Sequence, residues 1–111
     1  PKDDPARESV MQRAAEAACA APLRIMELCA DALDAAGRLA DIGSRLVVSD
    51  AGCAAAILKG ALEAASLNVL VNTKTMTDRA AAQRLNERWF ALLERGAEGG
   101  RIFRAVRERL T

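Results

Sequence analysis

The stretch from Ser49 to Asn72 constrains the fold more than any other part of the chain. Beyond its first two residues it carries only two charges, Lys59 and Glu63, which lie four residues apart and so share one helical face. A surface helix of this length would show a broad charged face. We therefore predict a central helix buried on most sides, with Ser49 as its N-cap and Asp50 in its first turn.

The predicted central helix also carries a ridge of small residues, each one helical turn from the next. A ridge with almost no side chain allows another helix to approach closely. Gly60 in the middle of a helix costs about 1 kcal/mol relative to alanine, which indicates a packing reason for it. The ridge consists of Gly52, Ala56, Gly60, Ala64 and Asn68.

Hydrophobic periodicity predicts further helices before this stretch. Asp4 and Pro5 are expected to begin the first one as N-cap and first helical residue, and Pro22 either ends it or kinks a longer helix. The helix from Leu23 to Ile42 has more apolar surface than a small unit could cover, so it packs against several neighbours or lies in a subunit interface. All its charges fall on one narrow stripe: Arg24, Glu27, Asp31, Asp34, Arg38 and Asp41.

The connections around the central helix contain recognisable signals. Gly43 and Ser44 are typical of a helix stop, and the segment 45–48 (RLVV) is predicted to be a short extended link. The central helix is expected to end near Asn72, with a turn over 73–76. Thr77 or Thr75 is then expected to cap the last helix, the latter with Asp78 as its capping-box partner.

The last helix carries a long apolar seam whose steps alternate between three and four residues, as in coiled-coil packing. Gly96, Gly99 and Gly100 either allow close contact with a neighbour or break the helix in two, and one helix with a weak middle is favoured. The seam consists of Ala82, Leu85, Trp89, Leu92, Gly96, Gly99, Phe103, Val106 and Leu110.

Together these patterns predict an all-α helical bundle of three to five helices in a single domain over residues 1–111, part of a larger or dimeric helical assembly. The net charge of +1 divides into −3 over residues 1–73 and +4 over residues 74–111. That asymmetry is too mild to indicate a nucleic-acid partner. The central stretch is long enough to span a membrane, but it is only weakly hydrophobic and has charges near its middle, so we expect no membrane span.

The sequence contains no histidine and no tyrosine, so acid–base chemistry would depend on carboxylates, lysine or a thiol, and histidine-ligated zinc is excluded. We expect no metal site. Cys19, Cys29 and Cys53 show no metal or redox spacing and have apolar neighbours. They are predicted to be reduced, buried thiols of a cytoplasmic protein.

Few residues could take part in chemistry, and each has a structural alternative. Asp50 could manage protons or balance a cationic intermediate, or could simply complement a helix N-terminus. Asn68, Asn72 and Lys74 could form a polar patch that binds an amide-rich, anionic ligand, or could belong to an ordinary helix end with a solvated lysine.

The stretch SDAGCAAAILKGALEAASLNVLVNTKTMTDR resembles a signature of the cyclodeaminase family, which includes the cyclodeaminase domain of formiminotransferase-cyclodeaminase and bacterial methenyltetrahydrofolate cyclohydrolase. The matching segments are 49–55 (SDAG and the alanines after it), 67–72 (LNVLVN) and 74–79. The opening Pro1-Lys2-Asp3 and the proline at position 22 also resemble family positions. The chain departs from the family at 43–46, where asparagines are usual.

The resemblance implies an all-helical protein that associates as a dimer and acts on a tetrahydrofolate derivative as cyclodeaminase or cyclohydrolase. It also implies a protein about twice as long, whose first half is missing here or is a separate chain. Asp50 and Lys74 would then be catalytic, and Ser49, Asn68 and Asn72 would bind substrate. Because Asp50 and Lys74 lie roughly 30 Å apart on one helix, a single site could contain both only across a subunit interface. The alternative is a non-catalytic helical interaction or oligomerisation module.

Overall fold

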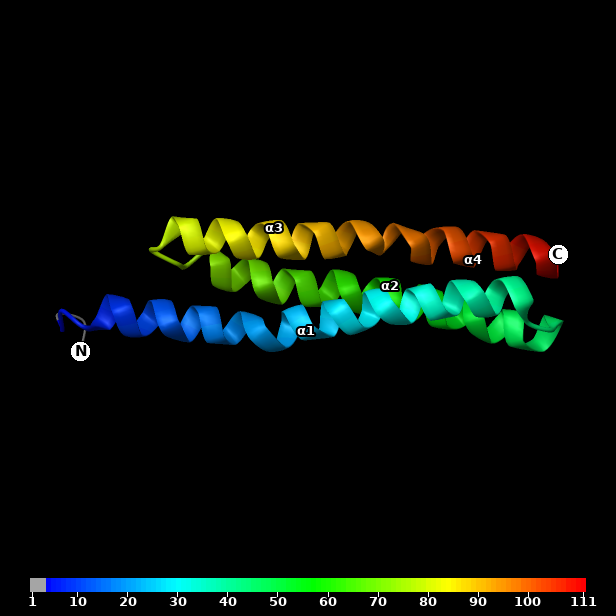
Figure 1. The fold of residues 1–111 in the computed structure, drawn as a ribbon, viewed down its shortest axis with the longest axis horizontal. Coiled ribbons are helices and arrows are strands. Elements are labelled where there is room, and N and C mark those ends of the chain that lie inside the picture. Colours follow the sequence, from blue (N-terminus) through cyan, green and yellow to red (C-terminus); the bar gives the residue numbers. More distant parts are fainter. Residues whose placement is uncertain (1–3) are drawn as a thin grey trace.

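The computed structural model describes residues 4–111, which form four helices and no strand. They are α1 (Arg7–Ile42), α2 (Arg45–Thr73), α3 (Arg79–Arg95) and α4 (Ala97–Leu110). Figure 1 shows three long rods, because α4 continues the line of α3, and the molecule measures 63 × 19 × 17 Å. The predicted all-α bundle is confirmed. The segment Pro1-Lys2-Asp3 lies outside the described residues.

The first helix begins later than predicted and runs on past its proline. Asp4 accepts a hydrogen bond from the backbone N–H of Ala6 at 2.9 Å, so it organises the turn before α1 and is not the N-cap. Helix α1 continues through Pro22, and the kinked alternative holds: the ribbon changes direction in this part of α1 in Figure 1. Burial of Cys19 before the proline, and of Leu23 and Met26 after it, keeps both halves of the helix against the core.

The predicted extended link at 45–48 is wrong, because α2 already begins at Arg45 with Ser44 as its N-cap. Ser49 is therefore not a cap, and Asp50 lies in the second turn, beyond the first-turn position expected of it. Val48 is fully buried, and it shares one face of α2 with Leu62 and Val69. Burial of this face outweighs the preference of two consecutive valines for extended backbone.

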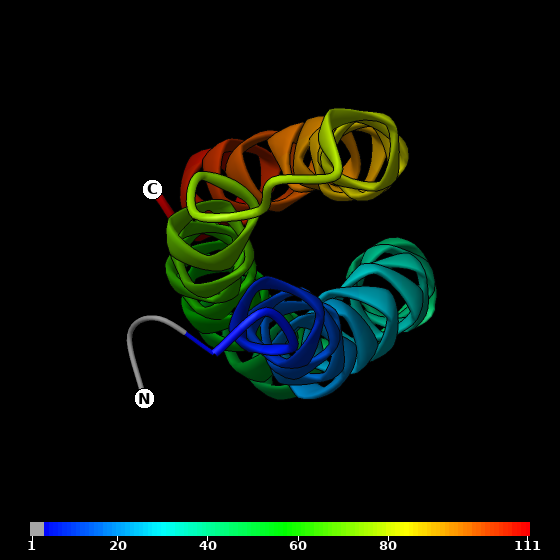
Figure 2. The same cartoon turned by 90° about the vertical axis from the view of Figure 1, so that its left-hand side faces the viewer.

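Helix α2 lies in the middle of the bundle, with α1 along one flank and α3 and α4 along the other (Figure 2). The prediction that α2 is buried on most sides is nevertheless wrong for this chain. Three rods cover only part of a central helix, and large apolar side chains such as Ile57 (71% exposed) and Leu67 (62% exposed) remain open to solvent. By length and composition α2 could also cross a membrane, a property that core helices of soluble proteins share.

The third rod starts at a cap that the sequence analysis assigned to the wrong residue. Asp78, and neither threonine, is the N-cap of α3, and its carboxylate accepts a hydrogen bond from the backbone N–H of Ala81 at 3.0 Å. The turn before it is held by Gln12 of α1, whose side-chain oxygen accepts from the backbone N–H groups of Thr77 and Asp78. A partner distant in sequence therefore defines this turn.

Gly96 separates α3 from α4 but keeps right-handed helical angles (φ −63°, ψ −20°), so the rod continues almost straight through it (Figure 1). The favoured description of one helical rod with a weak middle is thereby confirmed. Further on, Gly99 lies against α2: a Cβ at this position would come within 2.9 Å of the Ala55 carbonyl oxygen and of Lys59 Cβ. The glycine is needed for this close approach of the two helices.

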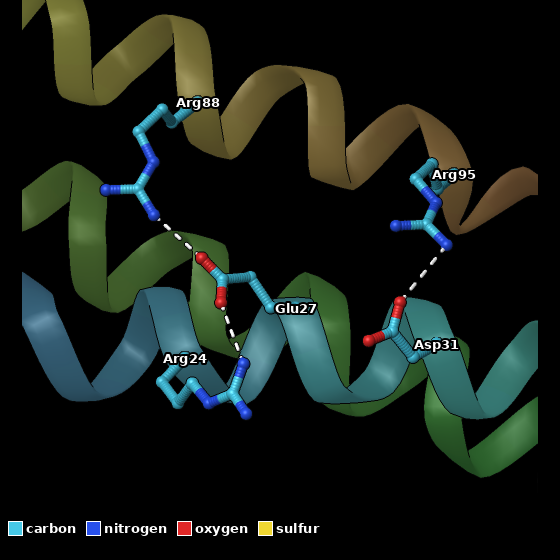
Figure 3. A network of polar contacts seen from close by, with 5 residues as sticks. All are labelled: Arg24, Glu27, Asp31, Arg88 and Arg95. Atoms are coloured by element: carbon cyan, nitrogen blue, oxygen red, sulfur yellow. Dashed lines mark hydrogen bonds and ion pairs between the residues drawn. The ribbon is translucent and has the colours of Figure 1, made fainter.

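The charged stripe of α1 faces the third rod (Figure 3). Glu27 binds Arg24 on its own helix at 3.0 Å and Arg88 of α3 at 2.7 Å. Arg95 of α3 lies 2.8 Å from Asp34 and 3.5 Å from Asp31. Arg88 and Arg95 of the third rod therefore bridge α1 and α3 at the surface of the bundle.

Cys19 and Cys29 are buried free thiols, as predicted. Burial raises the pKa of the Cys19 thiol, with a smaller contribution from Glu16, and burial alone raises the pKa of Cys29. Cys53 is exposed, contrary to the prediction, because it lies on the open face of α2.

Candidate functional site

The candidate site residues lie in two groups at opposite ends of α2. Ser49 and Asp50 occupy its second turn, whereas Asn68 and Asn72 occupy its last turns and Lys74 is its C-cap. Since α2 is one continuous helix, Asp50 lies about 27 Å from Asn68 and about 36 Å from Lys74 along the helix axis. The structure therefore brings the residues of each group together, and it does not bring the two groups together within one chain.

The first group lies beside a groove between α2 and α4 with a volume of about 470 Å³. Ser49 lines this groove and is half-buried, and the adjacent Asp50 is exposed. The other lining residues are mainly apolar: Gly52, Cys53, Ala56, Ile57, Phe103, Val106, Arg107, Leu110 and Thr111. The arrangement is suited to a flat apolar ligand whose polar edge reaches the serine and the carboxylate.

Gly52 shows why the SDAG segment needs its glycine. A Cβ at this position would lie 2.8 Å from Val106 Cγ1, so α4 contacts the backbone of α2 directly at the floor of the groove. This is the one position of the predicted small-residue ridge at which another helix of this chain makes that close approach. The remaining members of the ridge are exposed, so the ridge as a whole is not an internal contact.

The second group lies on the exposed side of the α2 C-terminus. The side-chain N–H groups of Asn68 and Asn72 donate to backbone carbonyls one turn back, those of Ala64 (3.4 Å) and Asn68 (2.8 Å). Within residues 4–111 neither amide oxygen accepts a hydrogen bond, so both are available to a ligand. Lys74 is exposed at the helix end.

Another residue satisfies the C-terminus of α2, which weakens the purely structural interpretation of this group. Arg79 donates to the Thr73 carbonyl at 2.8 Å and to the Met76 carbonyl at 3.0 Å. Lys74 and the two asparagines are therefore not required to cap these carbonyls. The sequence analysis missed Arg79, although a cation just after a helix end is a known capping signal.

A partly buried polar cluster behind the second group was also missed by the sequence analysis. Asn86 Oδ1 lies 2.7 Å from the Thr73 hydroxyl and accepts from Trp89 Nε1 at 2.8 Å. Thr73 is fully buried, so this cluster attaches the end of α2 to α3. It positions the helix end that presents the asparagines.

Among the described residues, no three carboxylate or thiol side chains come together as a metal site. The chemistry that the two groups offer is that of one carboxylate, one amine, one hydroxyl and two amides. These groups can accept and donate protons and can bind amide-rich, anionic ligands.

Comparison with known proteins identifies relatives of this chain. The sequence profile of the family described as formiminotransferase-cyclodeaminase matches residues 1–90. A methenyltetrahydrofolate cyclohydrolase from Methylorubrum extorquens is 38% identical over 106 residues, which cover 95% of this chain and 51% of the relative. The chain thus spans about half the length of that relative. With most of its length matched by the profile, the chain belongs to the formiminotransferase-cyclodeaminase family.

Proposed function

We propose that this chain acts in folate one-carbon metabolism, as a methenyltetrahydrofolate cyclohydrolase or a formiminotetrahydrofolate cyclodeaminase, or as one part of such an enzyme. The observation that carries the proposal is the family match, together with the identity of 38% to a cyclohydrolase along nearly the whole chain. The buried reduced thiols support a cytoplasmic location.

Both reactions take place at one carbon that bridges two folate nitrogens. In the hydrolase, water adds to the cationic methenyl bridge, and the ring opens to 10-formyltetrahydrofolate. In the deaminase, N10 attacks the formimino carbon, ammonia leaves and the methenyl bridge forms. Each reaction needs a group that accepts a proton, a group that donates one, and a negative charge near the amidinium-like cation.

We assign the proton acceptor and the balancing negative charge to Asp50, which is exposed next to the groove. Lys74 is the candidate donor, and Ser49, Asn68 and Asn72 are the candidate substrate-binding residues. The groove beside Ser49 is suited to the flat apolar portion of a folate, and the free amide oxygens of the asparagines suit the N–H edge of a pterin.

We further propose that the enzyme is a homodimer, or that the missing half of the family's length completes it. Asp50 and Lys74 lie at opposite ends of α2, so one chain cannot bring its candidate proton acceptor and donor together. In either case the second component would complete the site. The exposed apolar side chains on one face of α2 support the proposal that a second chain, or the other half of the family's length, covers that face.

The test is to follow the absorbance of 5,10-methenyltetrahydrofolate with this chain alone and with the remaining half of the Methylorubrum polypeptide added. We expect Asp50→Asn to lower turnover about 100-fold or more, the usual size of a general acid–base contribution. The matched control is Glu94→Gln on α3, which removes an exposed carboxylate far from both groups. Absence of both folate binding and turnover in the two preparations would contradict the proposal.

A non-catalytic interaction module remains the second candidate, and the open apolar face of α2 is the observation that favours it. Ile57, Leu67 and Val71 are each more than half exposed, as expected of a surface that binds another helix. Association of the chain without any folate binding would support this candidate over the enzyme.

A further inference from the structure

A second hollow between α2 and α4 continues the groove that begins beside Ser49. Its volume is about 330 Å³, and Ala56 and Phe103 line both spaces. The groove beside Ser49 is mainly apolar, whereas the second hollow also has charged walls. We call it the Gly100 hollow, formed by Lys59, Gly60 and Glu63 of α2 and by Gly100, Phe103 and Arg104 of α4.

Two cationic side chains converge over Gly100. The point where a Cβ of this residue would lie is 3.4 Å from Arg104 Nη1 and 3.9 Å from Lys59 Cε. Lys59 forms a 3.2 Å ion pair with Glu63, and within residues 4–111 the Arg104 guanidinium forms no ion pair. Two cations and one carboxylate give the hollow a net charge of +1. The lysine ammonium has donors left for a second carboxylate, so an anion above Gly100 can bind both cations.

The wall shared by the two spaces is aromatic. Phe103 is 43% exposed, and the Arg107 guanidinium lies 5.9 Å from the centre of its ring. A flat ring in the groove can pack against Phe103 and the exposed Ile57, and aromatic pairs favour such edge-to-face or offset contacts. An aromatic wall beside a cationic pair indicates a ligand in which a ring is joined to a carboxylate.

We propose that the Gly100 hollow binds the glutamate carboxylates of a folate whose benzoyl ring lies against Phe103. This assignment rests on the proposed function and gives the substrate a direction in the groove. Asp50 and Lys59 are nine residues, or about 14 Å, apart along α2. The benzoyl ring, the amide and the glutamate of a folate cover this span together with the reach of the lysine side chain. The reacting carbon then lies beside Asp50, and the carboxylates lie at Lys59 and Arg104.

The wall on α4 is a property of this chain that the family profile does not specify. The profile matches residues 1–90, whereas α4 covers Ala97–Leu110. Gly99 brings this helix against α2 and thereby places Gly100 and Arg104 beside Lys59. The hollow therefore depends on the same close helix contact that forms the floor of the groove.

Binding of a substrate fragment tests the proposal without any need for turnover. The probe is p-aminobenzoyl-L-glutamate, titrated into this chain while the backbone amide resonances of Gly99 and Gly100 are followed by NMR. We expect the diamide of the same compound, which lacks both carboxylates, to bind at least tenfold more weakly. Binding of the probe should also weaken as salt rises, because salt screens exposed charges. Equal affinity for the two compounds, or no change at these resonances with millimolar probe, would overturn the proposal.

Two variants of α4 test the role of Arg104. We expect Arg104→Gln to weaken probe binding about tenfold, because a charge-assisted hydrogen bond is lost. The matched control is Arg101→Gln on the same helix, whose arginine pairs with Glu98 and lines a crevice next to α1. The control should bind the probe as the wild type does. Equal losses in the two variants would show a general effect of net charge and would refute a specific contact.

The variant Gly100→Leu tests the hollow itself. The nearest atoms to its new side chain are the ends of the Arg104 and Lys59 side chains, which can move, so the chain still folds. We expect an unfolding temperature equal to or above that of the wild type, because a helix-interior glycine is replaced. Probe binding should nevertheless fall at least tenfold. A folded Gly100→Leu chain with unchanged affinity for the probe would rule out this hollow as the site.

Kinetics separate this proposal from the proposed function. In the preparation that combines both halves, Arg104→Gln should raise KM about tenfold and leave kcat unchanged, because the tail contact is the same in the bound substrate and in the transition state. Turnover by Arg104→Gln with an unchanged KM would contradict the hollow and leave the enzyme established. Specific binding of the probe without turnover of any folate would contradict the enzyme and leave a site for an aromatic carboxylate established.

Discussion

The two faces of α2 have similar apolar composition and opposite surroundings. On the inner face, Val48, Ala55, Leu62 and Val69 lie seven residues apart and are fully buried. On the outer face, Ile57 and Leu67 are more than half exposed, and Gly60 has open space around it. The apolar composition of α2 therefore indicates that its apolar surface tends to be buried. It does not indicate which face of the helix is buried by the other helices of this chain.

The largest expected difference between the faces is in core packing. Leu62→Ala removes a fully buried side chain from the inner face, and we expect it to lower the free energy of unfolding by about 2–5 kcal/mol. Leu67→Ala on the outer face should change that of the monomer by about 0.5 kcal/mol or less. Urea unfolding at low protein concentration measures both. Equal losses would show that the outer face is covered within the single chain.

Two glycine substitutions sharpen the comparison at a smaller scale. Gly52→Ala places a Cβ 2.8 Å from Val106 Cγ1, so α4 must shift, and we expect a loss of about 1–3 kcal/mol. Gly60→Ala meets no atom and removes a helix-interior glycine, so the monomer should gain up to about 1 kcal/mol. Thermal unfolding of the two variants at low protein concentration compares them. A loss of stability in monomeric Gly60→Ala would contradict the open surroundings of this glycine.

The smallest expected effect concerns the ion pairs between α1 and α3. These pairs are exposed to solvent, unlike the buried inner face of α2. Hydrogen bonding to Arg24, and then to Arg88, lowers the pKa of Glu27 below its usual value. This contribution to stability is fully present above the unfolded pKa of about 4.3, and it is lost as the pH falls through the lower folded pKa.

We therefore expect Glu27→Gln to be less stable than the wild type at pH 7, with the difference shrinking as the pH falls from about 4.3 toward 3. Chemical denaturation across this range measures the difference, and Glu94→Gln serves as the control because it leaves these pairs intact. A difference that stays constant from pH 7 to pH 3 would show that Glu27 acts through packing and that its charge contributes nothing.

Local signals predicted much of the candidate site and of the helices that hold it. The LNVLVN segment correctly placed the end of α2 near Asn72, whereas the SDAG segment placed its start four residues too late, and the candidate residues lie on or next to that helix. Caps were harder to predict. The structure assigns the cap of α3 to Asp78 because Gln12, 65 residues away in sequence, holds the preceding turn. Arg79, which satisfies the end of α2, was likewise missed.

By itself the sequence determined that this protein is helical, where its helices stop, and that their apolar surface exceeds what one short chain covers. These properties follow from local hydrogen bonding and from the periodicity of apolar residues, which act within a few turns. Only the tertiary structure decided which face of α2 is buried, and that burial of Val48 makes residues 45–48 helical. It also decided that Glu27 and Arg88 join α1 to α3. Those outcomes depend on contacts between residues far apart in the chain, and no local pattern specifies which of several similar apolar faces meets a neighbour.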